Sequence, residues 1–342
     1  MLPLPRSSDA LPARPFFANR SARRRTRFAL AGLALASLAT LPLDGRAQTV
    51  VQVRATATAG LTQMPVDAKR IDSPTGAALA ESASNAAAND LGAGASATRA
   101  SASLGLLTLR GDAADSAATN LDGNGFGAAS TSALAGWSDR LTVSSPSHTG
   151  SGLLHAVVFL QPLGAAAAQA AAGSGSAQFD GGGSLVARGT GVFSASFGQR
   201  VGLAPSSYSL VNGSAAPGGI FGAWDVAIPF VFGQAFDFGA SLTGLASSSA
   251  FAGGSSSAGV GLQLVWGGIQ NATLPDPAQA AAASSWPTAG DLTITDFSVT
   301  GQSGTDWRLA AAVPEPATAA LLPVGLLPVL GLARRRRGST AR

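Results

Sequence analysis

Few side chains in this sequence could perform acid–base or metal chemistry. Its two histidines, His148 and His155, stand seven positions apart, so they would face opposite sides of a regular strand and would not share a metal ion. Glu81 is the only glutamate in residues 48–312, which excludes a Glu pair for glycoside hydrolysis but leaves an Asp–Asp pair open. No Gly-x-Ser-x-Gly, His-Glu-x-x-His or phosphate-loop pattern is present. The sequence therefore predicts a protein that is not an enzyme and needs no cofactor. A hydrolase would require an Asp–Asp or Asp–His cluster in one cleft.

One short stretch, Asp122-Gly-Asn-Gly-Phe126, has part of the pattern of a calcium-binding loop. Asp122 and Asn124 could supply two oxygen ligands. The oxygen expected at the fifth position and the distal bidentate acid are both missing. We therefore interpret the stretch as a glycine-rich turn, with a structural Ca²⁺ at Asp122 and Asn124 as the alternative.

Tryptophan side chains can stack on sugar rings, and the chain has five of them. Trp266 alternates in phase with apolar neighbours, so we expect it in the core. Trp286 stands between Ser285 and Pro287, and we expect it to be exposed and available to a polysaccharide. The remaining candidates are Trp137, Trp224 and Trp307. A single exposed ring is a narrow basis for a carbohydrate-binding platform.

The charged residues are distributed unevenly along the chain. Of the 22 basic residues, eight lie at or before Arg46 and five at or after Arg334. By contrast, 15 of the 18 acidic residues lie within residues 48–312, so this part is mildly acidic although the whole chain carries a net charge of +4. An acidic middle argues against a nucleic-acid partner, which would require a basic surface. The absence of cysteine excludes disulfides, thiol chemistry and Cys zinc sites.

The first 47 residues have the three parts of a secretory signal peptide. Residues 20–27 include five arginines, residues 28–43 form an uncharged apolar run, and Gly45 and Ala47 place small side chains at positions −3 and −1 before Gln48. The apolar run has 16 residues, which is short for a permanent membrane span. We predict export through the secretion translocon and cleavage by signal peptidase between Ala47 and Gln48. A retained N-terminal anchor is the alternative.

The last 30 residues, 313–342, contain three segments in a fixed order. Val313-Pro314-Glu315-Pro316 comes first, and an uncharged run follows over 317–333. Arg334-Arg335-Arg336-Arg337 then opens a basic tail that continues to residue 342. The uncharged run would form a helix of about 26 Å, barely the thickness of a membrane core. The arginines would keep the tail in the cytoplasm, which places the middle of the chain outside.

This order of Pro-Glu-Pro, short apolar helix and arginine cluster resembles the PEP-CTERM sorting signal. The resemblance covers about 25 residues. It implies a Gram-negative envelope and an exosortase that cleaves near residues 313–316, so that an inner-membrane-anchored intermediate ends at the cell surface or outside the cell. It also implies, in many cases, a biofilm or exopolysaccharide setting. An ordinary tail anchor is the alternative.

Taken with the absence of catalytic motifs, the resemblance leads us to expect a non-enzymatic surface or extracellular-matrix protein. The second hypothesis is a carbohydrate-binding module for the cell's own exopolysaccharide. A β-sandwich in a polysaccharide setting would allow that function, but a fold alone does not establish it.

Residues 48–312 alternate apolar and polar side chains with period two, the pattern of half-buried strands. The clearest runs are 51–59, 193–197, 226–242 and 260–266. Pro229 cannot donate a ladder hydrogen bond, so it predicts a sheet edge or a bulge. We therefore expect a mainly β fold: an antiparallel β-sandwich or jelly-roll-like body (48–312), between an N-terminal signal helix (1–47) and a C-terminal transmembrane sorting helix.

Other segments of the body allow more specific predictions. The apolar run 153–160 predicts a strand buried on both faces, and the change of phase after Ile294 predicts a bulge near Asp296. Alternation favours strands over 95–110, although the surrounding Ala-rich sequence could be helical by propensity. Residues 276–287 are a short helix or a loop. Clusters of Gly, Ser and Asn predict turns at 173–184, 212–219 and 252–259.

Overall fold

A computed structural model describes residues 47–311, except residues 61, 120–124, 165, 172–173, 203–204, 213–220 and 276–291. The described residues form seventeen strands: β1 (Gln48–Ala59), β2 (Thr62–Gln63), β3 (Asp67–Ser73), β4 (Leu79–Asn89), β5 (Gly92–Ser103), β6 (Leu106–Ala117), β7 (Phe126–Ser144), β8 (Ser151–Pro162), β9 (Ala167–Ala170), β10 (Gly175–Ala187), β11 (Thr190–Val201), β12 (Ser206–Asn212), β13 (Gly222–Val231), β14 (Phe236–Phe251), β15 (Ser255–Leu274), β16 (Leu292–Ile294) and β17 (Ser298–Gly301). Within this part of the chain no helix is long and apolar enough to cross a membrane. The prediction of a mainly β body is confirmed, whereas the two predicted terminal helices lie outside the described residues.

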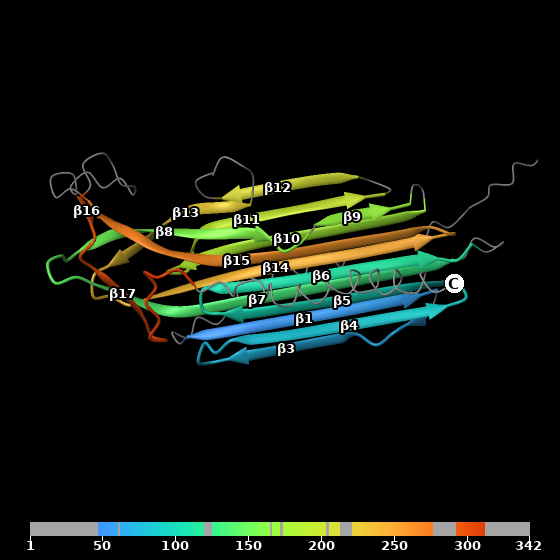
Figure 1. Cartoon of the computed structure of the whole chain (residues 1–342), viewed down its shortest axis with the longest axis horizontal. Helices are drawn as coiled ribbons and strands as arrows, with labels where there is room; N and C mark the ends of the chain where they lie inside the picture. Colours follow the sequence, from blue (N-terminus) through green and yellow to red (C-terminus); the bar gives the residue numbers. More distant parts are fainter. Residues whose placement is uncertain are drawn as a thin grey trace, which may run out of the picture.

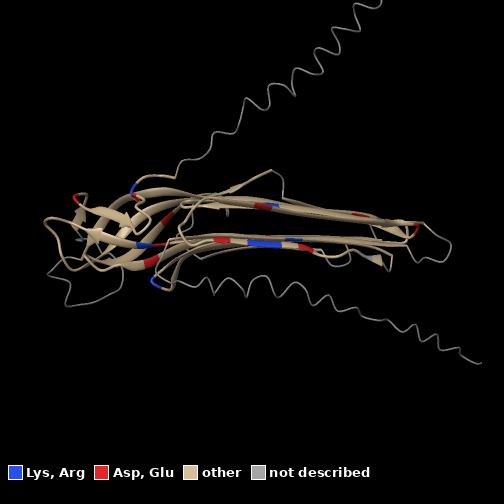
Figure 2. Cartoon of the chain, turned by 90° about the horizontal axis from the view of Figure 1, so that it is seen from below, with Lys and Arg blue, Asp and Glu red and all other residues tan. Residues whose placement is uncertain are grey.

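The strands form two antiparallel sheets that lie over one another as two layers (Figure 1, Figure 2). The nine-stranded sheet has the order β12-β11-β10-β14-β7-β1-β2, with β3 also paired to β1 and β17 to β7. The eight-stranded sheet has the order β13-β8-β15-β6-β5-β4, with β9 and β16 also paired to β15. The main hydrophobic core lies between the two sheets and includes residues of both.

Period-two alternation correctly identifies the buried face of several strands. In β1, every second side chain from Val51 to Ala59 is at most 1% exposed, while Gln52 and Arg54 face solvent. The predicted runs 193–197 and 260–266 are parts of β11 and β15, and the region 95–110 belongs to β5 and β6. Pro229 lies in β13 at the edge of its sheet, as its missing amide proton requires.

Two predictions fail because the chain crosses from one sheet to the other. The run 226–242 is not one strand: β13 and β14 belong to different sheets and are separated by a turn at Gly233, where φ is 72°. Likewise, Ile294 belongs to β16 and Val299 to β17, which lie in different sheets. The change of phase near Asp296 therefore marks a crossing between layers and not a bulge.

The prediction that residues 153–160 are buried on both faces is also wrong. Leu154 and Leu160, on the inner face of β8, are fully buried, but His155 and Phe159 on the outer face are only partly covered. The apolar side chains Val157 and Phe159 on the outer face pack against the neighbouring strand β15. The Phe159 ring lies over Gly267 of β15, where an added Cβ would stand 2.6 Å from the ring.

The glycine-rich stretch 173–184 lies largely within β10 and does not form the predicted turn. Gly181 and Gly183 face the core, where an added Cβ would lie 2.8 Å from Leu262 Cδ1 and 2.9 Å from Leu264 Cδ1, respectively. These glycines make room for leucines of the opposite sheet. In the cluster 252–259 the turn ends before Ser255, where β15 begins, and the cluster 212–219 lies almost entirely outside the described residues.

The core contains large side chains at one end of the body and almost none at the other. At the aromatic end, Trp137, Phe238, Trp266 and Trp307 pack with ring centroids 4.7 to 5.9 Å apart. At the opposite end, here called the glycine end, β5 and β7 approach each other directly from the two sheets. A Cβ added to Gly94 would lie 2.3 Å from the Ala128 carbonyl oxygen. The two sheets approach this closely because glycine has no side chain.

A buried carboxylate holds the last described segment against the aromatic end. Asp139 of β7 is 2% exposed. It accepts hydrogen bonds from Trp307 Nε1 (2.8 Å), Ser303 Oγ (2.6 Å) and the amides of Ser303 (3.2 Å) and Arg140 (2.8 Å). Gly301 passes so close that a Cβ there would lie 1.9 Å from Asp139 Oδ2. The donors compensate for burying the charge, and they connect residues 301–307 to the centre of the nine-stranded sheet.

The first and last described residues lie beside the same turn. A Cβ added to Gly76 would be 3.3 Å from Ala47 Cβ and 3.1 Å from Leu104 Cδ1. A Cβ added to Gly105 would be 2.9 Å from Ala311 Cβ. Leu104 and Gly105 connect β5 to β6, so both ends of the described chain meet at this connection.

Candidate functional site

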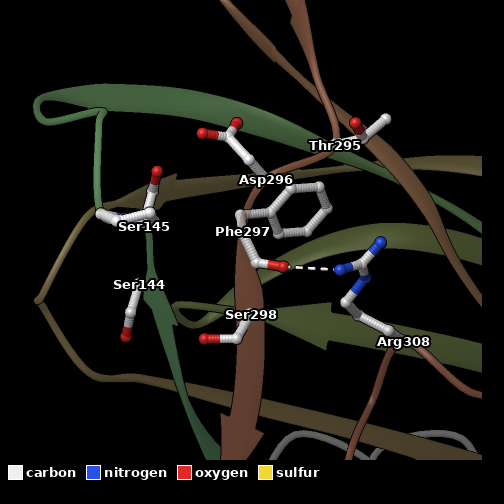
Figure 3. Close-up of a pocket in the computed structure, with 8 residues that line it drawn as sticks. Ser144, Ser145, Thr295, Asp296, Phe297, Ser298 and Arg308 are labelled. Carbon is white, nitrogen blue, oxygen red and sulfur yellow. Dashed lines mark hydrogen bonds between the residues drawn. The ribbon is translucent and has the colours of Figure 1, made fainter.

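A cavity of about 460 Å³ opens at the aromatic end of the body (Figure 3). It lies between the end of β7, the segment that joins β16 to β17, and the chain beyond β17. Its lining residues are Ser144, Ser145, Pro146, Thr295, Asp296, Phe297, Ser298 and Arg308. Hydroxyl groups, a carboxylate and a guanidinium group thus line one open hollow.

Asp296 connects two loops at the rim of this cavity. The Ser147 hydroxyl donates to Asp296 Oδ2, and His148 Nε2 lies 3.2 Å from Asp296 Oδ1. The hydrogen bond from Ser147 is the main cause that lowers the pKa of Asp296 below its usual value. The carboxylate therefore stays ionised at neutral pH.

Arg308 lies on the other side of the Phe297 ring from Asp296 (Figure 3). Its guanidinium carbon is 4.6 Å from the centre of the Phe297 ring, and Nη1 donates to the Phe297 carbonyl oxygen at 2.6 Å. No carboxylate among the described residues forms an ion pair with Arg308. The ring and the carbonyl hold the guanidinium in place, and its remaining N–H groups can donate to a ligand.

Ser147, His148 and Asp296 are the residue types of a hydrolytic triad, but their order differs from that of a triad. In a triad the imidazole lies between the carboxylate and the nucleophilic hydroxyl, so that it can accept the proton of the nucleophile. Here the carboxylate lies between the hydroxyl and the imidazole. This Asp–His contact therefore holds the loop after β7 against the β16–β17 segment, and its geometry suits hydrogen bonding to a ligand better than nucleophilic attack.

A second polar cluster lies inside the body, between the sheets. Asp115 of β6 is 8% exposed and accepts a hydrogen bond from Ser256 Oγ at 2.9 Å. Burial raises its pKa to about 6, although Ser248 and Ser256 act in the opposite direction. Ser248 comes from the other sheet, and neither its hydroxyl nor Asp115 Oδ2 has a hydrogen bond of full geometry within the described part. The carboxyl group is therefore only partly compensated for its burial.

The described histidines do not come together. His155 Nε2 pairs with Thr273 Oγ1 at 2.9 Å, while His148 pairs with Asp296. Four of the five tryptophans, Trp137, Trp224, Trp266 and Trp307, are each 1% exposed. The prediction that Trp266 is buried is thus confirmed, and none of these four rings can stack on a sugar in this structure.

Most of the other predicted site residues lie outside the described residues. These are Asp122, Asn124, Trp286, Val313-Pro314-Glu315-Pro316 and Arg334-Arg335-Arg336-Arg337. The two residues of the predicted signal cleavage site are described: Ala47 is 6% exposed and Gln48 is the first residue of β1.

Sequence reasoning did not identify Arg308 or Asp296 as site residues. They are separated along the chain from Ser145 and His148 by about 150 residues, and the pairing of β17 with β7 brings the two regions together. The one local signal was the change of phase around Asp296. It marks the point where the chain leaves one sheet and passes the cavity.

Comparison with known proteins gives no relative: no family model, no curated protein sequence and no solved structure matches this chain.

Proposed function

We propose that this chain is a non-enzymatic surface or matrix protein that is exported by residues 1–47 and sorted through residues 313–342. The observation that best supports the proposal is the position of the two described ends. Ala47 and Ala311 both lie beside the Leu104–Gly105 connection. A C-terminal membrane helix would therefore hold the β body at one point, and cleavage on either side would leave the sheets intact.

The proposal assigns partners at each step of this route. The secretion translocon and signal peptidase would act at Ala47 and Gln48, and an exosortase would act near Val313-Pro314-Glu315-Pro316. Before that cleavage the membrane itself is a partner through residues 317–333, with Arg334 to Arg337 on the cytoplasmic side. The product is a protein of the cell surface or the extracellular matrix.

Replacing Pro314, Glu315 and Pro316 together by alanine is expected to leave a full-length, membrane-bound precursor. Prolines lack amide protons and favour an extended chain, which is the form that a cleaving enzyme can bind. Membrane fractionation and the mass of the released protein measure the effect. Replacing Gly338, Ser339 and Thr340 by alanine is the matched control and should leave processing unchanged. Wild-type protein that stays intact in the inner membrane of cells with an active exosortase would contradict the proposal.

The cavity at the aromatic end supports a second candidate function, binding of the cell's own exopolysaccharide. Serine hydroxyls, Asp296 and Arg308 are groups that can hydrogen-bond sugar hydroxyls or carboxylates.

Replacing Arg308 by glutamine is expected to weaken binding about ten- to a hundred-fold, because it removes charged hydrogen bonds. Sedimentation with purified exopolysaccharide measures this effect. Arg110→Gln is the control, since Arg110 lies on the outer face of β6 and pairs with Asp112 at 2.9 Å. Equal binding by both variants would exclude the cavity as the binding site.

A further inference from the structure

β12 is the outermost strand of the nine-stranded sheet, and among the described residues it pairs with β11 alone. All side chains from Ser206 to Leu210 are exposed, although successive side chains point to opposite faces of the sheet. The nine-stranded sheet therefore extends here beyond the layer that covers it. An edge strand of this kind presents a row of N–H and C=O groups that can pair with another strand.

The other long edges of the described sheets carry features that prevent strand pairing. β13 contains Asp225 and Pro229. β3 is highly charged, and its side chains hydrogen-bond backbone groups on the edge of β4. Lys69 Nζ donates to the Ser82 carbonyl oxygen at 2.8 Å, and Asp67 Oδ2 accepts from the Ser84 amide at 2.9 Å, so these backbone groups already have partners. Among the described edge strands of seven residues or more, β12 alone contains neither a charged residue nor a proline.

The side chains of β12 are complementary to a second copy of the same strand. In an antiparallel pair related by a two-fold axis at Ser209, Tyr208 of each copy lies opposite Leu210 of the other, on one face of the sheet. Both side chains are exposed in the single chain, at 42% and 66%. The Tyr208 hydroxyl donates to Asp180 Oδ1 at 2.8 Å, so the ring is already held in place by its own sheet.

We infer that two copies of this protein associate through β12, which joins their nine-stranded sheets into one continuous antiparallel sheet. Each copy has one such edge, and the far end of the same sheet is closed to pairing by the charges of β3. A two-fold interface uses the same strand of both copies, so the assembly closes at the dimer and does not extend to a fibre.

A cysteine at the proposed axis tests the register of this interface directly. The chain contains no cysteine, so Ser209→Cys introduces a single thiol. Directly opposed residues of an antiparallel pair have Cα atoms about 4.5 to 5.5 Å apart, within the range of a disulfide. Mild oxidation of the full-length chain, purified in detergent, is expected to double its mass on a non-reducing gel, and a reductant should reverse the change. Ser82→Cys, on the edge strand β4, is the control and should remain monomeric.

The mass of the unmodified protein supplies an independent measurement. Light scattering is expected to show a two-fold increase in mass as concentration rises, and Leu210→Lys should abolish the increase because it places a charge in the interface. Ala86→Lys, at a position of β4 that is also exposed, should not. A single-chain mass at every concentration would overturn the inference. Equal cross-linking of the two cysteine variants, or a dimer unaffected by Leu210→Lys, would also overturn it.

Discussion

Replacing Asp139 with alanine is expected to lower the free energy of unfolding by about 3 to 5 kcal/mol. The substitution removes the acceptor of Trp307 Nε1 and of both donors of Ser303. The indole donor would then stay buried without a partner, because Trp307 is 1% exposed and packs against Trp137. Leaving a buried donor unpaired costs about 1 to 3 kcal/mol, and several donors lose their partner at once.

Urea-induced unfolding measures this loss, and near-ultraviolet circular dichroism reports the packing of the tryptophans during the same titration. Asp112→Ala is the matched control, because Asp112 is an exposed carboxylate whose ion pair with Arg110 should contribute little. The control should change the stability by less than about 0.5 kcal/mol. A loss below about 1 kcal/mol for Asp139→Ala would show that the carboxylate does not hold the closing segment.

Replacing Asp115 with asparagine is expected to stabilise the protein above pH 6 and to leave it nearly unchanged below pH 4. The folded-state pKa of about 6 exceeds the ordinary value of 3.8, so the folded protein binds this proton more tightly than the unfolded chain does. The contribution of the protonated carboxyl group is therefore complete below about pH 3.8 and is lost as the pH rises through 6. At about 1.4 kcal/mol per pKa unit, the full loss is about 3 kcal/mol.

Unfolding titrations at pH 3.5, 5, 6 and 8 test this prediction. The difference in stability between Asp115→Asn and the wild type should grow from near zero to about 2 to 3 kcal/mol over the series. Asp112→Asn serves as the control for the general effect of removing a carboxylate from β6. A difference that does not depend on pH would mean that Asp115 titrates as an exposed group.

Much of the β body follows from local patterns, because a strand with one buried face must alternate. β1 is the clearest case: from Val51 to Ala59 the alternation of its side chains predicts which of them are buried. Local patterns do not reveal which sheet a strand joins. The run 226–242 keeps its period through the turn at Gly233, since the apolar residues of β13 and of β14 both face the same core. Only the pairing of distant strands separates the two.

Glycine and serine are also ambiguous in the sequence. They are typical of turns, yet Gly94, Gly181 and Gly183 lie inside strands where the other sheet comes too close for a side chain. The sequence did not reveal the cavity either, because its residues come from two distant regions, 144–146 and 295–308, and neither carries a catalytic or binding motif. For Trp137, Trp224 and Trp307 the residue type alone suggested sugar stacking, whereas their packing places them in the core. Trp266 was predicted in the core because its position alternates in phase with apolar neighbours.

The meeting of both described ends at the Leu104–Gly105 connection determines how far the protein can reach. β15 has 20 residues, which span about 66 Å at 3.3 Å per residue, and it runs from the glycine end toward the aromatic end. A body held at Ala311 can therefore extend the glycine end several nanometres from its point of attachment, as a rigid arm rather than a flexible chain. The uncharged edge of β12 runs along that arm, and its antiparallel two-fold pairing would point the arms of the two copies in opposite directions. Their points of attachment would then lie at opposite ends of the dimer, so pairing would follow release from the membrane.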